Sequence, residues 1–293
     1  MTKDKMKKEI RPQFLKFFIP MVESLKDLGG SGTASEVIDL AIDKLGISER
    51  EQQETIKNGE SRVRNQAQWA RLYLAKGGYI SATGRGIWTL TKKSLDETLT
   101  EDKAMAIIRE QRKIYRISKQ PPKKVKQLKE DVEDQPTLFQ DEGLLTVLLK
   151  LPPEGFERVC QRLLREAGFQ EVKVTGKSSD GGIDGYGILE VNPFVSFNVL
   201  FQSKRYKGAV SASQVRDFRG AMQGRADKGI IITTGSFTSD AKKEARRDGA
   251  PPIELVDGEK LVEMFEKLNL GVIPKTVYQV DEDFFKEFSI YNK

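Results

Sequence analysis

The sequence predicts a two-domain protein of the α/β (α+β) class, in which a small helical domain precedes an αβ sandwich. A chain of 293 residues is long enough for about two domains. Its first third shows helical periodicity followed by two short strand-like segments, and its second half alternates helical and strand-like segments. With 38% hydrophobic and 31% charged residues, it has the composition of globular domains with packed cores.

The composition excludes several kinds of catalytic site. The chain contains no histidine, which excludes Ser-His-Asp catalysis, Cys-His catalysis and His-ligated zinc. Its single cysteine, Cys160, excludes an intrachain disulfide, fits a reducing compartment and is expected to be a core thiol. Any chemistry therefore depends on carboxylates, lysine, amides, a hard metal ion and water.

Charge and hydropathy indicate where the protein acts. No run of 18 apolar residues and no apolar signal region occurs, so we expect a cytoplasmic protein without membrane contact. The net charge of +6 favours a polyanionic partner such as nucleic acid. The run Gly176-Lys177-Ser178 is not a phosphate-binding loop, because Glu171 stands where that motif needs glycine, so we expect no nucleotide cofactor.

Residues 1–92 contain three predicted helices and a hairpin. Apolar residues recur at helical spacing from Pro12 to Leu28, and a capping box at Thr33 opens a second helix. A third helix starts near Ser61, and two strands follow around Gly84-Arg85-Gly86. Three helices followed by a β-hairpin form the winged helix-turn-helix pattern.

In that pattern the third helix enters the major groove of DNA and the hairpin tip contacts the backbone or the minor groove. The polar side chains of this helix can pair with base edges or phosphates; they are Arg62, Arg64, Asn65, Gln66, Gln68 and Arg71. Arg85 at the hairpin tip is a candidate phosphate contact, whereas Trp69 and Trp88 are expected in the core. The alternatives are a solvated helix face or a protein–protein module.

A helical, charged linker is predicted for residues 93–143, and the sandwich for residues 144–293. Predicted helices of the sandwich cover residues 144–151, 153–167, 213–225, 239–247 and 257–268. Predicted strands cover residues 172–174, 183–189, 195–204, 229–234 and 253–256. Residues 271–293 receive no role.

The sandwich carries one constellation with chemical meaning. Asp184 follows a glycine-rich turn, and Gln202 and Lys204 end the next predicted strand. Alternation along a strand puts Gln202 and Lys204 on the same face, about 7 Å apart. A carboxylate is a natural Mg²⁺ ligand, and a lysine beside it can stabilise charge on a phosphodiester.

In this region the chain resembles the Mrr family of restriction endonucleases, within the PD-(D/E)XK nuclease superfamily. The resemblance is carried by five sequence blocks, which are residues 155–157, 175–185, 201–206, 214–221 and 231–238. It covers residues 150–270, and residues 12–92 look like the family's N-terminal winged-helix domain. The implied fold is a restriction-endonuclease-like αβ sandwich joined to that domain by the linker.

The resemblance implies a role for each residue of the motif. Asp184 is then the metal-binding acid, Lys204 the catalytic lysine and Gln202 the replacement for a second carboxylate. Glu157, on the preceding helix, is the candidate compensating ligand, or else a surface acid. Arg205 and Lys207 are candidate contacts to the DNA backbone. Gln214 supports either the site or the start of its own helix.

These observations predict an endodeoxyribonuclease that depends on Mg²⁺, with Mn²⁺ as a substitute, and that hydrolyses double-stranded DNA. The resemblance implies prokaryotic defence against foreign or methylated DNA, and cutting two strands implies a homodimer. One alternative is a catalytically silent DNA-binding or regulatory protein on the same scaffold. Another is a junction or repair nuclease.

Overall fold

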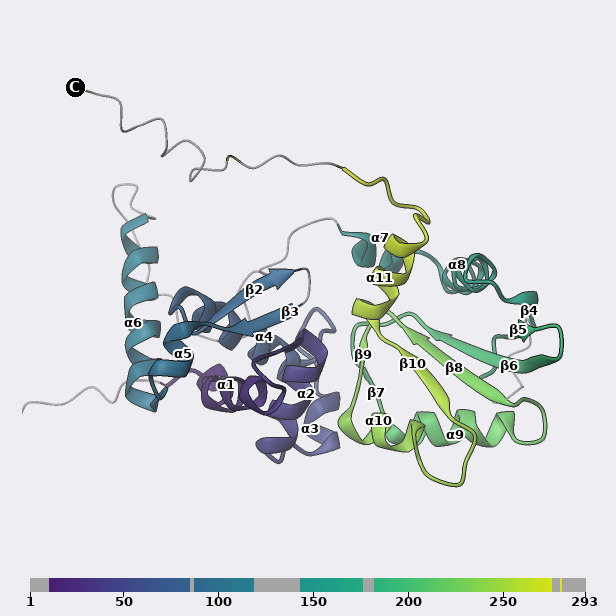
Figure 1. Ribbon diagram of the computed structural model, residues 1–293, viewed down its shortest axis with the longest axis horizontal. Coiled ribbons are helices and arrows are strands. Elements are labelled where there is room, and N and C mark those ends of the chain that lie inside the picture. The colour runs from purple at the N-terminus through teal and green to yellow at the C-terminus, as the bar shows by residue number, and fades with distance from the viewer. Residues whose placement is uncertain (1–10, 85–86, 119–142, 176–181, 276–279, 281–293) are drawn as a thin grey trace, which may run out of the picture.

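The computed structural model describes residues 11–84, 87–118, 143–175, 182–275 and 280. These residues form two domains, which lie side by side (Figure 1). Within the described residues, no helix is both long enough and apolar enough to span a bilayer.

The N-terminal domain contains the three predicted helical segments and the predicted hairpin. Its helices are η1 (Gln13–Phe17), α1 (Phe18–Asp27), α2 (Ala34–Lys44), α3 (Glu49–Gln53) and α4 (Arg62–Lys76). The antiparallel sheet has the order β1-β3-β2, with strands β1 (Ser31–Thr33), β2 (Ile80–Gly84) and β3 (Ile87–Leu90). The capping box at Thr33 is confirmed, since Thr33 Oγ1 accepts from the backbone N–H of Glu36 at 3.2 Å. Helix α3 and strand β1 are short and were not predicted.

The N-terminal domain extends beyond the predicted boundary at residue 92. Helices α5 (Lys92–Asp96) and α6 (Glu101–Ser118) follow the hairpin directly. Leu99, Ala104 and Ile108 are buried in the same apolar cluster as α1 and α4. The segment that was predicted as the start of a linker is therefore part of this domain, because one apolar face of α6 completes its core.

The second domain is built on a five-stranded mixed sheet with the order β10-β8-β6-β5-β4. Its strands are β4 (Gln170–Val174), β5 (Gly185–Asn192), β6 (Val195–Lys204), β8 (Lys228–Thr233) and β10 (Ile253–Val256). The pairs β4–β5 and β5–β6 are antiparallel, and the pairs β6–β8 and β8–β10 are parallel. The carboxyl ends of β6, β8 and β10 therefore meet at one edge of the sheet.

Helices cover both faces of this sheet (Figure 1). One face carries α7 (Leu144–Lys150), α8 (Pro153–Glu166) and α11 (Gly258–Lys267), and the other carries α9 (Ala212–Met222) and α10 (Ser239–Ala245). The predicted αβ sandwich is confirmed. A small parallel sheet of β7 (Ala209–Val210) and β9 (Ser236–Phe237) was not predicted, because two-residue strands leave no periodic signal.

Within the described parts of the chain, the buried apolar residues form three separate clusters. One cluster fills the N-terminal domain, and the other two fill the two faces of the second domain's sheet. No cluster contains residues of both domains. The two domains therefore have independent cores.

Independent cores predict that a core substitution destabilises one domain only. Phe218 is fully buried on α9, so Phe218→Ala should lower the unfolding free energy of the second domain by about 3–5 kcal/mol. Hydrogen-exchange mass spectrometry should show the loss of protection in residues 144–268 and little change in residues 14–108. Phe18→Ala, in the other core, is the reciprocal control. Equal losses in both domains would contradict independent cores.

Candidate active site

Strand pairing places Asp184 opposite the end of β6. Gly185 pairs with Phe201 in the antiparallel β5–β6 ladder. The backbone N–H of Asp184 donates to Phe201 O at 3.0 Å, and its carbonyl accepts from Thr175 N at 2.8 Å. Hydrogen bonds from both neighbouring segments thus hold the main chain at Asp184.

The carboxylate of Asp184 is anchored by Ser203. Oδ2 of Asp184 accepts from the backbone N–H of Ser203 at 2.6 Å and from Ser203 Oγ at 2.7 Å. Both donors bind Oδ2, and neither of them occupies Oδ1 of Asp184. Sequence reasoning missed Ser203 because it lies between the two motif residues. Its hydroxyl was the only signal that could have marked it.

Gln202 is buried, and its amide is held in one orientation. Its Nε2 donates to the carbonyl of Gly182, two residues before Asp184. Among the described residues, Gln202 Oε1 is buried without a hydrogen-bond partner. Gly182 adopts φ = 80°, and a β-carbon there would collide with the Gln202 amide. Glycine at position 182 therefore keeps room for this side chain.

Lys204 ends β6 beside these groups. Its carbonyl accepts from Thr233 Oγ1 at 2.9 Å and from Thr234 N at 3.3 Å, which ties the strand end to β8. Burial lowers the pKa of the Lys204 ammonium, and the negative charges of Asp184 and Asp217 act in the opposite direction. The lysine is thus a partly desolvated cation next to an acid.

Two carboxylates share this region. Burial raises the pKa of Asp184, and the bonds from Ser203 and the charge of Lys204 oppose the rise. The pKa of Glu157 on α8 is raised by burial first, then by the charge of Asp184 and then by that of Glu154. Glu157 and Asp184 therefore lie within electrostatic range of each other and carry the same sign of charge. A divalent cation between them would relieve that repulsion.

The donor set fits a hard cation. No three Cys, Asp or Glu side chains form a metal-binding group within the part of the chain that is described. A cation at this place would be held by Asp184 and Glu157 together with Gln202 Oε1, all of them oxygen ligands that suit Mg²⁺. The unpartnered, buried Oε1 of Gln202 is the feature that such an ion would satisfy.

A groove runs past Glu157. It measures about 720 Å³ and is lined by Glu154, Glu157, Arg158, Gln161, Lys173 and Val174. Arg158 and Lys173 bring positive charge into the groove that Glu154 and Glu157 also line. Neither was named from the sequence, because a single cation on a helix or strand carries no pattern.

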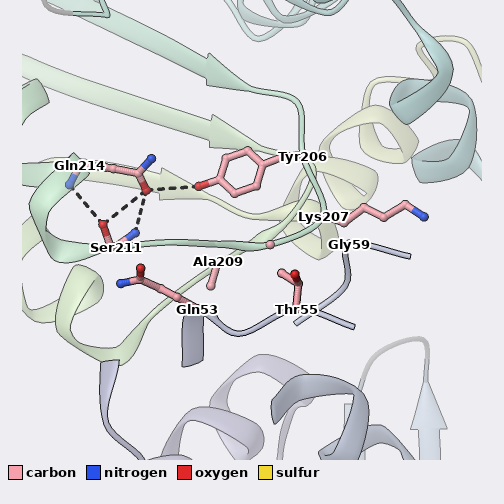
Figure 2. A pocket seen from close by; sticks show the side chains of 9 residues that line it. Gln53, Thr55, Gly59, Tyr206, Lys207, Ala209, Ser211 and Gln214 are labelled. Atoms are coloured by element: carbon pink, nitrogen blue, oxygen red, sulfur yellow. Dashed lines mark hydrogen bonds between the residues drawn. The ribbon is translucent and has the colours of Figure 1, made fainter. Parts of the chain in front are cut away.

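The three other site residues predicted in this domain lie away from the groove. Arg205 Nη1 donates to Leu149 O at 2.7 Å, so α7 binds this guanidinium. Gln214 is the third residue of a capping box, in which its Oε1 accepts from Ser211 N at 3.0 Å. Gln214 and the exposed Lys207 line a pocket of about 410 Å³ between the two domains (Figure 2).

The residues of α4 that were predicted to read DNA differ in how far they are exposed to solvent. Gln66 is a correction: it is 6% exposed and donates to Gln13 Oε1 at 2.8 Å. It shares the core face of α4 with Val63 and Ala70, so it cannot read a base. Arg62 pairs with Glu54 at 3.1 Å on the surface.

The remaining predicted residues of α4 are partly covered. Arg64 pairs with Asp39 at 2.5 Å, and Arg71 lies over the ring of Trp88, 5.3 Å from its centroid. Asn65 and Gln68 are half-buried. Trp88 is buried and Trp69 packs against the core, as predicted. Arg85 lies outside the described residues.

Two family models match the chain. A model described as a restriction endonuclease (Mrr_cat) matches residues 148–265, and the Mrr N-terminal domain matches residues 14–99. No curated protein matches the sequence.

Two solved structures are among those that match the chain. The DNA modification-dependent restriction endonuclease AspBHI is 18% identical with a TM-score of 0.40, covering 65% of this chain and 56% of that chain. The MspJI restriction endonuclease in complex with a 27-mer oligonucleotide is 22% identical with a TM-score of 0.37, covering 62% and 48%. The chain therefore spans about half the length of these two structures.

Cys160 offers a test of the packing beneath the site. The thiol is fully buried on α8, and burial raises its pKa, with the charges of Asp184 and Glu157 adding to the rise. A raised pKa keeps the thiol protonated at pH 8, so the native protein should resist alkylation by iodoacetamide. Mass spectrometry should show rapid modification only after unfolding in guanidinium. Rapid modification of the native protein would contradict this packing.

Proposed function

The chain belongs to the Mrr family of restriction endonucleases, and we propose on this premise that it is a metal-dependent endodeoxyribonuclease that hydrolyses phosphodiester bonds of double-stranded DNA. One observation carries the proposal. The anchored carboxylate of Asp184, the unpartnered amide oxygen of Gln202 and the ammonium of Lys204 belong to residues at the start of β5 and the end of β6, and the charge of Asp184 acts on Lys204. Ser203 holds the carboxylate of Asp184, and the carbonyl of Gly182 orients the amide of Gln202.

Asp184, Gln202 and Glu157 are the residues that would hold Mg²⁺, with Mn²⁺ as a substitute. When bound, the ion supplies Lewis acidity at a phosphate oxygen and lowers the pKa of a bound water. The two hydrogen bonds from Ser203 keep the Asp184 carboxylate in one position, so this ligand is already oriented before the metal ion binds. Because Gln202 is neutral where a second motif carboxylate is expected, Glu157 supplies the compensating charge.

Lys204 acts on the phosphodiester directly. Its ammonium is a compact cation that donates to the oxygens on which negative charge increases during hydrolysis. Its position at the strand end is supported by the bonds from Thr233 and Thr234. Partial burial strengthens its interaction with a bound phosphate, because the local dielectric is lower than that of water.

The DNA backbone passes along the groove beside Glu157. Arg158 and Lys173 line this groove and supply charge that binds phosphates without reading bases. The N-terminal domain, which we interpret as a winged helix, supplies the sequence contacts. Foreign or methylated DNA is the proposed target, and a homodimer brings the two active sites that cutting both strands needs.

The test of the proposed function is cleavage of methylated and unmethylated plasmid DNA by wild type and Asp184→Ala, in Mg²⁺ or in EDTA. Cutting that requires metal and disappears in the variant is the expected result. A difference between the two plasmids would show that methylation is selected. Binding without cutting under every condition would favour a silent, regulatory DNA-binding protein.

Removing the ammonium should separate cutting from binding. Lys204→Ala is expected to lower the single-turnover cleavage rate by on the order of 10²–10³-fold, because a donor to the developing charge is lost. DNA affinity in EDTA should change little, since one phosphate contact among several is removed. An unaltered cleavage rate would remove Lys204 from the proposed active site.

Glu157 is tested through the metal requirement. Glu157→Gln should raise the Mn²⁺ concentration needed for half-maximal cleavage about tenfold or more, because a charged ligand becomes neutral. The direct readout is Mn²⁺ binding by electron paramagnetic resonance without DNA. Glu154→Gln is the matched control, since Glu154 lines the same groove but is exposed. Equal effects of the two substitutions would indicate general loss of charge and not loss of a ligand.

A further inference from the structure

The face of α4 that was predicted to read DNA is turned toward the second domain. Arg64, Gln68 and Arg71 are spaced four and three residues apart, so they share one face of the helix. Arg64 Nη2 donates to Phe237 O of β9 at 3.2 Å. The carboxylate of Glu259, at the start of α11, lies within electrostatic range of both Arg64 and Arg71.

A charge cluster joins the domains beside this face. Asp39 of α2 pairs with Arg64 of its own domain and with Lys242 of α10 in the other domain. Lys242 Nζ also donates to Ser35 Oγ at 2.9 Å. Asp39 and Arg64 are each 18% exposed, so both members of the pair are largely removed from water. We call Asp39, Arg64 and Lys242 the latch.

Helix α3 makes a second set of contacts. Glu49 Oε1 accepts from the backbone N–H of Ala212 at 2.6 Å and from Thr238 Oγ1 at 3.0 Å. Gln52 Oε1 accepts from Ser239 N at 3.0 Å. The carboxylate and the amide of α3 thus satisfy backbone donors at the starts of α9 and α10, which are otherwise left unpaired by the helix.

These contacts are polar, and the two domain cores do not merge across them. Ion pairs and hydrogen bonds of this kind exchange readily for water, salt or phosphate oxygens, unlike a shared apolar core. Phe237 and Ser239 follow β8, and Glu259 follows β10, so the N-terminal domain docks on the sheet edge where Lys204 ends β6.

We propose that this docked arrangement is a closed resting state, in which the second domain covers the DNA-reading face of α4 and the latch must open before DNA binds. The inference rests on the proposed function, because it concerns how the same DNA reaches the reading helix and the active site. DNA phosphates compete for Arg64 with the carboxylate of Asp39. Opening then frees both the helix face and the sheet edge.

Reversing the charge of Lys242 tests the latch. Lys242→Glu places a carboxylate next to Asp39, so the closed state is destabilised. Affinity for a duplex in EDTA, measured by fluorescence anisotropy, should rise about tenfold, the ratio that corresponds to about 1.4 kcal/mol. A rise in affinity would be informative, because the loss of a positive charge by itself weakens DNA binding.

The matched control is Lys267→Glu, the same charge change on α11, where Lys267 is 78% exposed and its ammonium lies 3.9 Å from the carboxylate of Glu263 in the same helix. It should bind DNA no more tightly than wild type. Arg64→Ala is unsuitable, because it would open the latch and remove a DNA contact together. Equal or weaker binding by a folded Lys242→Glu overturns the proposal.

A disulfide across the seam tests the proposal without changing charge. A β-carbon at Gly208 would lie 3.6 Å from Cγ2 of Thr55, the atom whose place a cysteine sulfur can take, so Thr55→Cys and Gly208→Cys are the pair chosen for a bridge. The Tyr206 ring, 3.3 Å from that β-carbon, must yield by a few tenths of an ångström. Cys160 is buried and does not compete. The oxidised double variant should bind DNA at least about tenfold more weakly than the same protein after reduction, with plasmid cutting lost and regained in parallel.

The outcomes separate the inference from the proposed function. Equal binding by the oxidised and reduced forms, with metal-dependent cutting in both, would overturn the closed state and leave the nuclease intact. Weaker binding on oxidation with no cutting in either form would support the closed state and contradict the nuclease. Failure of wild type, Lys242→Glu and the reduced variant to bind any duplex would overturn both.

Discussion

The antiparallel register of β5 and β6 is the constraint on which the active site depends. The pairing of Gly185 with Phe201 sets Asp184 across from the end of β6, where Ser203 donates twice to its carboxylate. A shift of one residue would turn every side chain to the other face of the sheet and separate the acid from Lys204. The register is maintained by alternate burial: Ile183, Gly185 and Gly187 are buried, and a β-carbon at Gly185 would collide with Phe201 while one at Gly187 would press on Val172.

The parallel half of the sheet gives this site its surroundings. Because β6, β8 and β10 run in the same direction, their carboxyl ends bring Lys204, Thr233 and the start of α11 to one edge. That edge also receives the N-terminal domain. The proposed chemistry and the domain docking therefore use neighbouring loops, so we expect a change in docking to alter access to Lys204. Coupling between DNA recognition by the N-terminal domain and cleavage by the second domain, as proposed, would not require a structural change transmitted through the core.

The latch and DNA draw on the same physical chemistry. A guanidinium that can bind a DNA phosphate can also bind a carboxylate of its own protein. Phosphate and carboxylate both present charged oxygens that the planar fork of N–H donors of arginine can bind in pairs. Arg64 is paired with Asp39, and Glu259 lies near Arg71. Intramolecular carboxylates can thus occupy a nucleic-acid surface until a polyanion replaces them. Because the contact is polar, its strength depends on ionic strength more than an apolar interface would.

Much of this organisation follows from local sequence. Helical periodicity, the capping box at Thr33 and alternating helix and strand signals predicted the order of the main elements. The spacing of Asp184, Gln202 and Lys204 predicted that Gln202 and Lys204 end the strand beside the segment of Asp184, because strand alternation is a local property. The predicted domain boundary at residue 92 was wrong, because the sequence pattern of the amphipathic α6 is the same for a solvent-exposed linker helix and for a helix that packs on a core. The role of Gln66 failed similarly, because helix polarity does not tell which polar residue faces inward.

By itself, the sequence determined the two-domain α/β architecture, the exclusion of histidine chemistry and the Asp-Gln-Lys constellation. Only the tertiary structure decided that Ser203 anchors the acid, that Gln202 presents an unpartnered oxygen and that Glu157 lies within electrostatic range of Asp184. It also decided that Arg64 meets Asp39 and Phe237, in different elements and, for Phe237, in another domain. The reason is physical: backbone periodicity is set by near neighbours, whereas these contacts join residues far apart in the chain and form only when the sheet, its helices and the two domains have packed.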